Sequence, residues 1–139
     1  MYLLDTNVVS ELRKPKPHGG VSAWIKTVPD EHLFVSAVTL GEIQRGIERV
    51  RGNDRDKAAL LDEWADGVAA SSNILPMSGE AFRLWGRLMP GRAAIHAMDM
   101  MLAATAAIHG LTLATRNVRD FTGIHISVMN PFEYSSSRS

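Results

Sequence analysis

Residues 97–117, AMDMMLAATAAIHGLTLATRN, decide the fold. The part up to His109 is apolar on almost every side, which predicts a buried helix over residues 96–109. Gly110 is the residue type that most often ends a helix in the left-handed conformation. The apolar run from Leu111 to Thr115 then predicts a buried strand, so a helix is followed directly by a strand.

The same alternation continues along the rest of the chain. Apolar runs predict further strands at residues 2–5, 33–35, 74–75 and 124–128. The spacing of apolar side chains predicts helices at residues 8–12, 21–28, 38–50, 55–70 and 82–88. Thr6 or Asn7 is expected to cap the first of these helices, and Ser36 the third. We therefore predict a three-layer α/β fold, with a central twisted parallel sheet of four to five strands flanked by helices.

Composition excludes several classes of protein. The chain has 139 residues, which corresponds to one domain, and it contains no cysteine for disulfides, thiolate catalysis or thiolate metal sites. Lys and Arg number 15 and so do Asp and Glu, which argues against nucleic-acid binding driven by bulk charge. Residues 52–77 hold two bases and five acids, a net charge of −3, so the rest of the chain carries +3. A modestly basic rim around an acidic centre is compatible with this distribution.

The expected location is the cytoplasm, with no membrane association. An acid at the fifth residue is unlike a signal peptide, and the longest apolar stretch, Met100 to Ile108, falls short of the roughly 20 residues that cross a bilayer. We expect one domain over residues 1–134 and a disordered serine-rich tail over residues 135–139. No glycine-rich phosphate loop is present, which argues against a nucleotide cofactor.

Three acids lie where a parallel α/β sheet binds ligands, near the carboxyl ends of its strands. Asp5 ends the first predicted strand, Glu42 lies in the helix after the second, and Asp99 is the only charge within residues 97–108. Each acid also has a structural explanation. Asp5 suits a turn, Glu42 suits an ion pair with Arg45, and Asp99 suits the positive end of a helix dipole. Asn117 and Asp120 follow the fourth strand, where a turn accounts for both.

The three acids together predict a metal site. Two like charges about 4 Å apart, at an effective dielectric constant of about 20, cost on the order of 4 kcal/mol, so a compensating cation is expected. Oxygen ligands without cysteine or a zinc-like histidine spacing favour Mg²⁺ or Mn²⁺. Such an ion suits the hydrolysis of phosphodiesters, because it activates water and stabilises the leaving oxygen.

Five segments resemble the PIN-domain family, and within it the VapC toxins of type II toxin–antitoxin systems, in particular the FitB-like branch. In chain order they are LLDTNVVSE at 3–11, SAVTLGEIQRG at 36–46, DMMLAATA at 99–106, LATRNVRDF at 113–121 and NPF at 130–132. The resemblance covers nearly the whole chain. It implies a PIN-like domain and a Mg²⁺- or Mn²⁺-dependent endoribonuclease.

The resemblance also implies roles for individual residues. Asp5 and Asp99 match the direct metal ligands of the family, and Glu42 matches its third regular acid. Many members have a fourth acid where this chain has Asn117, and Asp120 follows three residues further on, so both are candidates for the fourth catalytic position. Apart from the resemblance, Arg116 and Thr6 are candidate RNA contacts, and a structural ion pair would explain Arg116 equally well. The implied partners are a VapB-like antitoxin that covers the pocket, a second toxin copy in a homodimer, and operator DNA bound by the toxin–antitoxin complex through the antitoxin.

Two alternatives remain open at this point. A phosphatase-like α/β enzyme would use Asp5 as its nucleophile, although such enzymes usually carry a second acid where this chain has Asn7. A PIN fold that only binds or regulates a partner would not need Asp5, Glu42 and Asp99 together.

Overall fold

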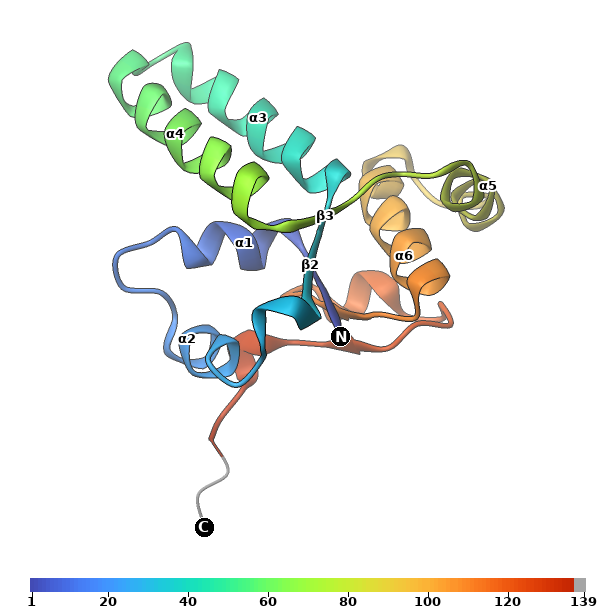
Figure 1. The fold of residues 1–139 in the computed structure, drawn as a ribbon. Helices are drawn as coiled ribbons and strands as arrows, with labels where there is room; N and C mark the ends of the chain where they lie inside the picture. Colours follow the sequence, from blue (N-terminus) through green and yellow to red (C-terminus); the bar gives the residue numbers. More distant parts are fainter. Residues whose placement is uncertain (137–139) are drawn as a thin grey trace.

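The chain folds around a five-stranded parallel sheet, seen in a computed structural model that describes residues 1–136 (Figure 1). The strands are β1 (Tyr2–Leu4), β2 (Leu33–Ser36), β3 (Asn73–Leu75), β4 (Thr112–Ala114) and β5 (Val128–Met129). Their order in the sheet is β3-β2-β1-β4-β5, and every neighbouring pair is parallel. The predicted parallel sheet is confirmed.

The order of the strands reverses next to β1. The chain builds β2 and β3 on one side of β1 and then crosses to place β4 and β5 on the other side. Leu4 pairs in register with Val35 of β2 and with Ala114 of β4. The residues that directly follow β1 and β4 are therefore neighbours at the carboxyl edge of the sheet, and the backbone N–H of Asp5 donates to the carbonyl of Ala114 at 2.9 Å.

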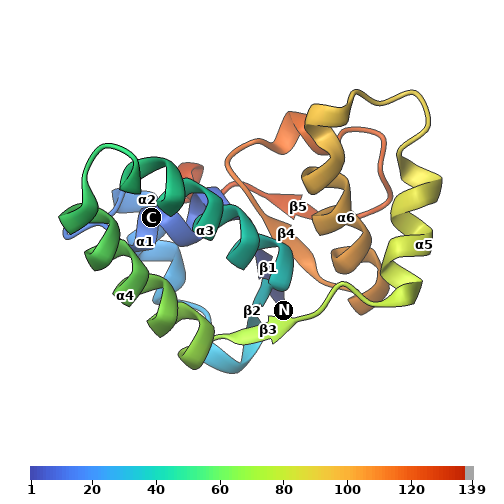
Figure 2. The ribbon, with the colours of Figure 1, turned by 90° about the horizontal axis from the view of Figure 1, so that it is seen from above.

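Helices cover both faces of the sheet, which confirms the three layers. The helices are α1 (Thr6–Leu12), α2 (Gly19–Ile25), α3 (Ala37–Arg51), α4 (Arg55–Ser71), α5 (Gly79–Leu88) and α6 (Ala97–His109). Leu4 and Val35 pack into a core with α1 to α4, while Leu3 and Leu113 pack into a second core with α6. Figure 2 shows α1 to α4 in one half of the molecule and α5 and α6 in the other.

The ends of the helices follow from local side-chain chemistry. Ser36 caps α3 by accepting a hydrogen bond from the backbone N–H of Val38, as predicted. Ser78 caps α5 in the same way through the N–H of Ala81. Gly110 ends α6 in the left-handed conformation at φ 63°, which confirms the predicted junction between helix and strand.

The cap of α1 differs from the prediction of Thr6 or Asn7. Asp5 is the N-cap, and its carboxylate accepts a hydrogen bond from the N–H of Thr6. Thr6 is already the first helical residue, and its hydroxyl is used in a contact with α3. Asp5 therefore combines the structural role that the sequence suggested for its neighbours with a place at the carboxyl edge of the sheet.

The fifth strand also begins later than predicted. Residues 124–126 form bends, and pairing with β4 starts at Val128. Gly123 turns the chain at φ 84°, and Ile124 and Ile126 point apolar side chains into the second core. The apolar pattern of this stretch thus reflects anchoring of a loop rather than a continuous strand.

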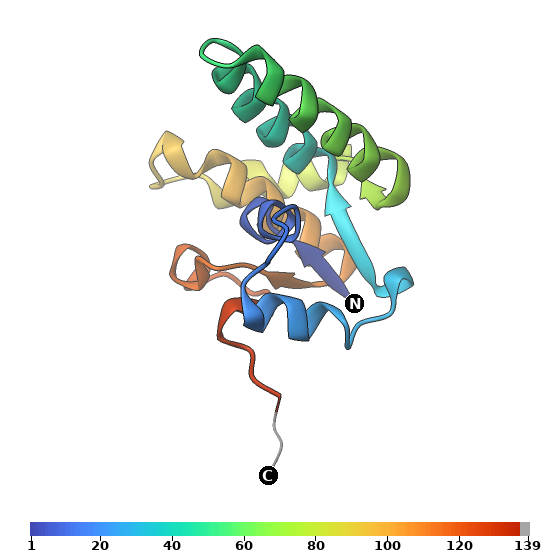
Figure 3. The same ribbon diagram turned by 90° about the vertical axis from the view of Figure 1, so that its left-hand side faces the viewer.

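The α3–α4 hairpin stands at the opposite side of the molecule from the C-terminal segment (Figure 3). Arg51 of α3 donates to Glu48 at 2.8 Å and also pairs with Asp62 of α4, which fixes the two helices together. Residues 137–139 of the predicted tail lie outside the described residues. Among the described residues, no helix combines the length and the apolar character that crossing a membrane requires.

Candidate active site

Asp5 directly follows β1 and lies beside the end of β4, where the strand order reverses, and only 5% of its surface is exposed. Its Oδ1 accepts a hydrogen bond from the N–H of Thr6 at 2.6 Å. Its Oδ2 accepts from the hydroxyl of Thr115 at 2.7 Å and from the amide of Asn7 at 3.3 Å. Three donors, from the segments that follow β1 and β4, therefore hold the carboxylate of Asp5 in one orientation.

Glu42 approaches the same edge from the second turn of α3 and is half-buried. Its Oε1 accepts a hydrogen bond from the hydroxyl of Thr6 at 2.7 Å, and that hydroxyl lies 3.2 Å from the hydroxyl of Thr39. Thr6 therefore connects the start of α1 to α3 and orients Glu42. The predicted contact between Thr6 and RNA stays a prediction.

Asp99 enters the site from the first turn of α6. Its side chain is 29% exposed, and its Oδ2 lies 3.6 Å from Nδ1 of His96. The place of Asp99 in the first turn fits the helix dipole explanation, which is compatible with a site role.

The three acids influence one another electrostatically. Burial raises the pKa of each of them, and it is the largest cause in every case. The charges of Asp5 and Asp99 further raise the pKa of Glu42, and the charge of Asp5 further raises the pKa of Asp99. The fold thus gathers three carboxylates from three separate elements. Within residues 1–136, no three His, Asp or Glu side chains are close enough to enclose an ion by themselves.

Asp120 and Asn117 differ in how they relate to these acids. Asp120 lies in a short 3₁₀ helix, Val118–Phe121, and its charge raises the pKa of both Asp5 and Asp99. Asn117 is exposed, and its backbone N–H donates to the hydroxyl of Thr115 at 3.0 Å. Both residues line a cavity of about 460 Å³ beside the site. Asp120 therefore adds a negative charge that acts on Asp5 and Asp99, whereas Asn117 is neutral.

Arg116 follows β4 on an exposed loop whose backbone is fixed. Its N–H donates to Oδ1 of Asn7 at 3.1 Å, and its carbonyl accepts from the amide of Asn130 at 3.5 Å. Its guanidinium carbon lies 4.4 Å from the ring centroid of Phe132, in a cation–π arrangement. The role of Arg116 in RNA binding stays a prediction.

Sequence reasoning missed two residues that position the site, Thr115 and Asn7. Thr115 is fully buried, and its hydroxyl donates to Asp5 while it accepts from the backbone of the next loop. Asn7 joins the start of α1 to the loop after β4. The signal that pointed to Asp5, a polar residue at the carboxyl end of a buried strand, applies equally to Thr115.

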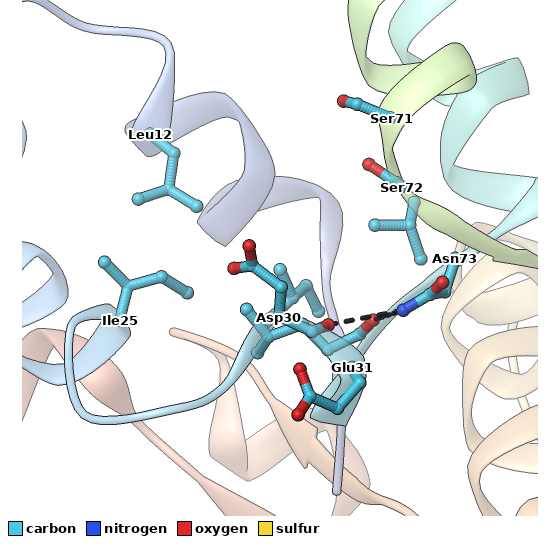
Figure 4. Close-up of a pocket in the computed structure, with 10 residues that line it drawn as sticks. Leu12, Ile25, Asp30, Glu31, Ser71, Ser72 and Asn73 are labelled. Atoms are coloured by element: carbon cyan, nitrogen blue, oxygen red, sulfur yellow. Dashed lines mark hydrogen bonds between the residues drawn. The ribbon is translucent and has the colours of Figure 1, made fainter.

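A further cavity, which was not predicted, is lined by none of the three acids. It measures about 610 Å³ and lies between α1, α2, the start of β2 and the end of α4. Figure 4 shows Leu12 and Ile25 on one side of it and Ser71, Ser72 and Asn73 on the other. The amide of Asn73 donates to the carbonyls of Leu33 and Asp30 at 2.9 and 3.3 Å, which connects β3 to the first residue of β2 and to the segment before it.

Comparison with known proteins settles the family. The model of the PIN domain matches residues 2–124, which is most of the chain. The chain belongs to the PIN-domain family. The sheet of this PIN domain, with its acids at the carboxyl edge beside β1, is thus the family's fold as well as the one predicted from the sequence.

Similarity extends over almost the full length of this PIN domain. It is 33% identical over 140 residues to VapC ribonuclease Y4jK of Sinorhizobium fredii, covering 96% of this chain and 99% of the relative. It is 32% identical over 139 residues to toxin FitB of Neisseria gonorrhoeae, covering 95% and 99%. The crystal structure of FitAcB from Neisseria gonorrhoeae matches with a TM-score of 0.80 at 31% identity, covering 96% and 99% of the two chains.

Proposed function

We propose that this PIN domain is a VapC-like endoribonuclease toxin of a toxin–antitoxin module, active with Mg²⁺ or Mn²⁺. The observation that carries the proposal is the gathering of Asp5, Glu42 and Asp99, from three elements, at the switch point of the sheet. The similarity of nearly the whole chain to a VapC ribonuclease and to toxin FitB supports the same activity.

The donor set of the site fits a hard divalent cation. All of its acidic ligands are carboxylate oxygens, and burial and mutual repulsion raise the pKa of each. Mg²⁺ in proteins usually binds one or two carboxylates together with water and substrate phosphates, so it does not need three side chains arranged in advance. Asp5 and Asp99 would hold the ion, and Asp120 rather than Asn117 would add the fourth negative charge.

Different residues of the site would serve different steps of the cleavage reaction. A bound divalent ion would activate water for attack on the phosphodiester and stabilise the leaving oxygen. Thr115 and the N–H of Thr6 keep the carboxylate of Asp5 in place. Glu42, oriented by the hydroxyl of Thr6, has a raised pKa, which makes it a better acceptor for the proton of the attacking water near neutral pH.

The surroundings of Asp5 argue against the phosphatase-like alternative. Such an enzyme usually carries a second acid two residues after its nucleophile, and this chain has the neutral Asn7 there. Asn7, at the position of the expected second acid, is bound to the backbone of Arg116.

The proposed partners are a VapB-like antitoxin, a second toxin copy and, through the antitoxin, operator DNA. The matched solved structures include FitAB bound to an IR36 DNA fragment, with a TM-score of 0.78 at 29% identity and coverage of 99% of this chain. Antitoxin binding over the acidic centre would block access of RNA, which explains inhibition by simple exclusion.

Cleavage of a single-stranded RNA with and without EDTA tests the proposal. We expect EDTA to abolish cleavage by the wild type, and Asp99→Asn to lower kcat by at least about 100-fold, because it removes one ligand charge. Asp66→Asn is the matched control, since Asp66 is exposed on α4, outside the site. Cleavage that persists in EDTA, or an unimpaired Asp99→Asn variant, would contradict the mechanism.

A further inference from the structure

The three arginines of α3 have different environments. Arg51 pairs with Glu48 on its own helix and with Asp62 of α4, so its charge is used within the hairpin. Arg45 and Arg49 are exposed, and within residues 1–136 neither forms an ion pair. Two free positive charges therefore remain on this helix.

Helix geometry places these two charges on the side of α3 that carries Glu42. At 3.6 residues per turn, Arg45 and Arg49 lie roughly 60° and 20° around the axis from Glu42, and Arg49 lies roughly 10 Å further along it. Arg51, which pairs with α4, belongs to the other side of the helix. Arg45 and Arg49 consequently face away from α4 and continue the face that begins at the acidic centre.

Gly46 opens the same face between the two arginines. A Cβ added to Gly46 would meet no atom within 4 Å, and its backbone φ is not positive. Neither close packing nor backbone conformation requires glycine here, although glycine in a helix interior is less stable than alanine. Its absence of a side chain leaves the helix surface accessible to a ligand that must come close.

The acidic centre needs such positive charge if its substrate is a polyanion. Asp5, Glu42 and Asp99 carry three negative charges when ionised, and one divalent ion would offset two of them, so positive charge outside the centre would help to attract a phosphate backbone. The charge of Arg45 reaches Glu42, whose pKa it lowers against the effect of burial. Figure 2 shows α3 extending from the sheet edge towards the outer end of the hairpin, so the face leads away from the site.

We propose that the face of α3 formed by Arg45, Gly46 and Arg49 binds the backbone phosphates of single-stranded RNA and guides the strand to the acidic centre. The inference rests on the proposed ribonuclease function. It assigns the binding of single-stranded RNA to α3 and the cleavage of the phosphodiester to the acids.

The salt dependence of RNA affinity tests this assignment. In the Asp99→Asn background, in which cleavage is expected to be at least about 100-fold slower, affinity for a labelled single-stranded RNA is measured at several salt concentrations. Each lost phosphate contact lowers the log–log slope by about 0.7, so Arg45→Ala with Arg49→Ala should lower it by about 1.4. The ratio of the RNA affinity measured with both arginines present to that of the double-alanine variant should then fall about sevenfold between about 50 and 200 mM salt.

Two arginines of α5 give a matched control. Arg83 and Arg87 have the same spacing of four residues on a helix, and both are exposed. They lie in the other half of the molecule (Figure 2). Their replacement by alanine removes the same charge and should leave the slope unchanged. An equal loss in both double variants would overturn the assignment, because it would indicate a non-specific effect of net charge.

Gly46→Gln tests the open surface independently of charge. The added side chain should raise KM for RNA at least about fivefold while the melting temperature stays the same or rises, because glutamine favours helix. Gly67→Gln is the control, since Gly67 lies inside α4 and a Cβ there also meets nothing within 4 Å. Equal KM values for the two variants would contradict the proposal.

The outcomes separate this inference from the proposed function. If the wild type cleaves RNA with metal while the α3 variants bind and cleave as well as it does, the assignment to α3 is wrong and the ribonuclease stands. If the wild type neither binds nor cleaves RNA, both are wrong. If the variants lose only the binding of an antitoxin, the face is a protein interface and the RNA assignment is overturned.

Discussion

At the scale of single residues, the site depends on neutral side chains that hold charged ones. Asp5 keeps its orientation because Thr115 and Asn7 donate to one oxygen and the backbone of Thr6 donates to the other. These bonds favour the ionised carboxylate and oppose burial, which raises its pKa. Replacing one of the side chains that donate to Asp5 should therefore shift the pKa of Asp5 while the fold is retained.

Thr115→Val is the corresponding test. Loss of the hydroxyl removes a donor to the carboxylate, so the pKa of Asp5 should rise further and the acidic limb of the kcat/KM profile should move to higher pH. A hydrogen bond to a charged group contributes about 1.5–3 kcal/mol, which sets the expected loss of stability.

Thr112→Val provides the comparison for Thr115→Val, since it makes the same change in β4, which ends directly before Thr115, at a residue that forms no hydrogen bond with Asp5. A pH profile that moves equally in both variants, or in neither, would show that Thr115 does not act through Asp5.

At the scale of elements, α3 serves two purposes on two sides. Its side towards α4 carries the network of Arg51, Glu48 and Asp62, and the opposite side carries Glu42 and the two free arginines. The hairpin can therefore be weakened without touching the face proposed to bind RNA.

Arg51→Ala should separate these two purposes. The variant loses its pairs with Glu48 and Asp62, and partly exposed pairs contribute up to about 1 kcal/mol, so a small fall in stability is expected by chemical denaturation. The salt dependence of RNA affinity should stay as in the wild type. A lower slope in Arg51→Ala would mean that charge anywhere on α3 attracts RNA.

At the scale of the whole molecule, three carboxylates with raised pKa values make the metal-free protein less stable as pH rises. Their folded pKa values exceed the unfolded ones, so the folded state binds more protons between the two values. The stability that protonation contributes is present below the unfolded pKa and is lost as pH increases through the folded pKa.

Melting curves should show this balance directly. Without metal, Asp99→Asn should stabilise the protein at pH 7 by up to about 1 kcal/mol, or roughly 3 °C in Tm, because it removes repulsion. Mg²⁺ should raise the Tm of the wild type more than that of Asp99→Asn. A sharp fall in Tm for the metal-free variant would instead assign Asp99 a structural role.

The sequence predicts the fold well and singles out Asp5, whose position the structure explains, for physical reasons that also account for what it misses. Buried strands are apolar and the residues at their ends are polar, so the parallel sheet and Asp5 can be predicted from the sequence. Thr115 acts through a partner 110 residues away, and only the register of β1 and β4 reveals the pair. The late start of β5 could not be predicted from the sequence, because a loop anchored by Ile124 and Ile126 has the same apolar pattern as a strand.

The reversal of strand order beside β1 has a consequence for biosynthesis. β1 is made first yet lies in the middle of the sheet, and its second neighbour, β4, begins only at Thr112. At about 5–20 residues per second, a ribosome needs roughly 5–20 s to reach β4 after β1. Until then Asp5 lacks Thr115, and α6 has no completed sheet to pack on. The acidic centre is therefore assembled late, after most of the chain has been synthesised.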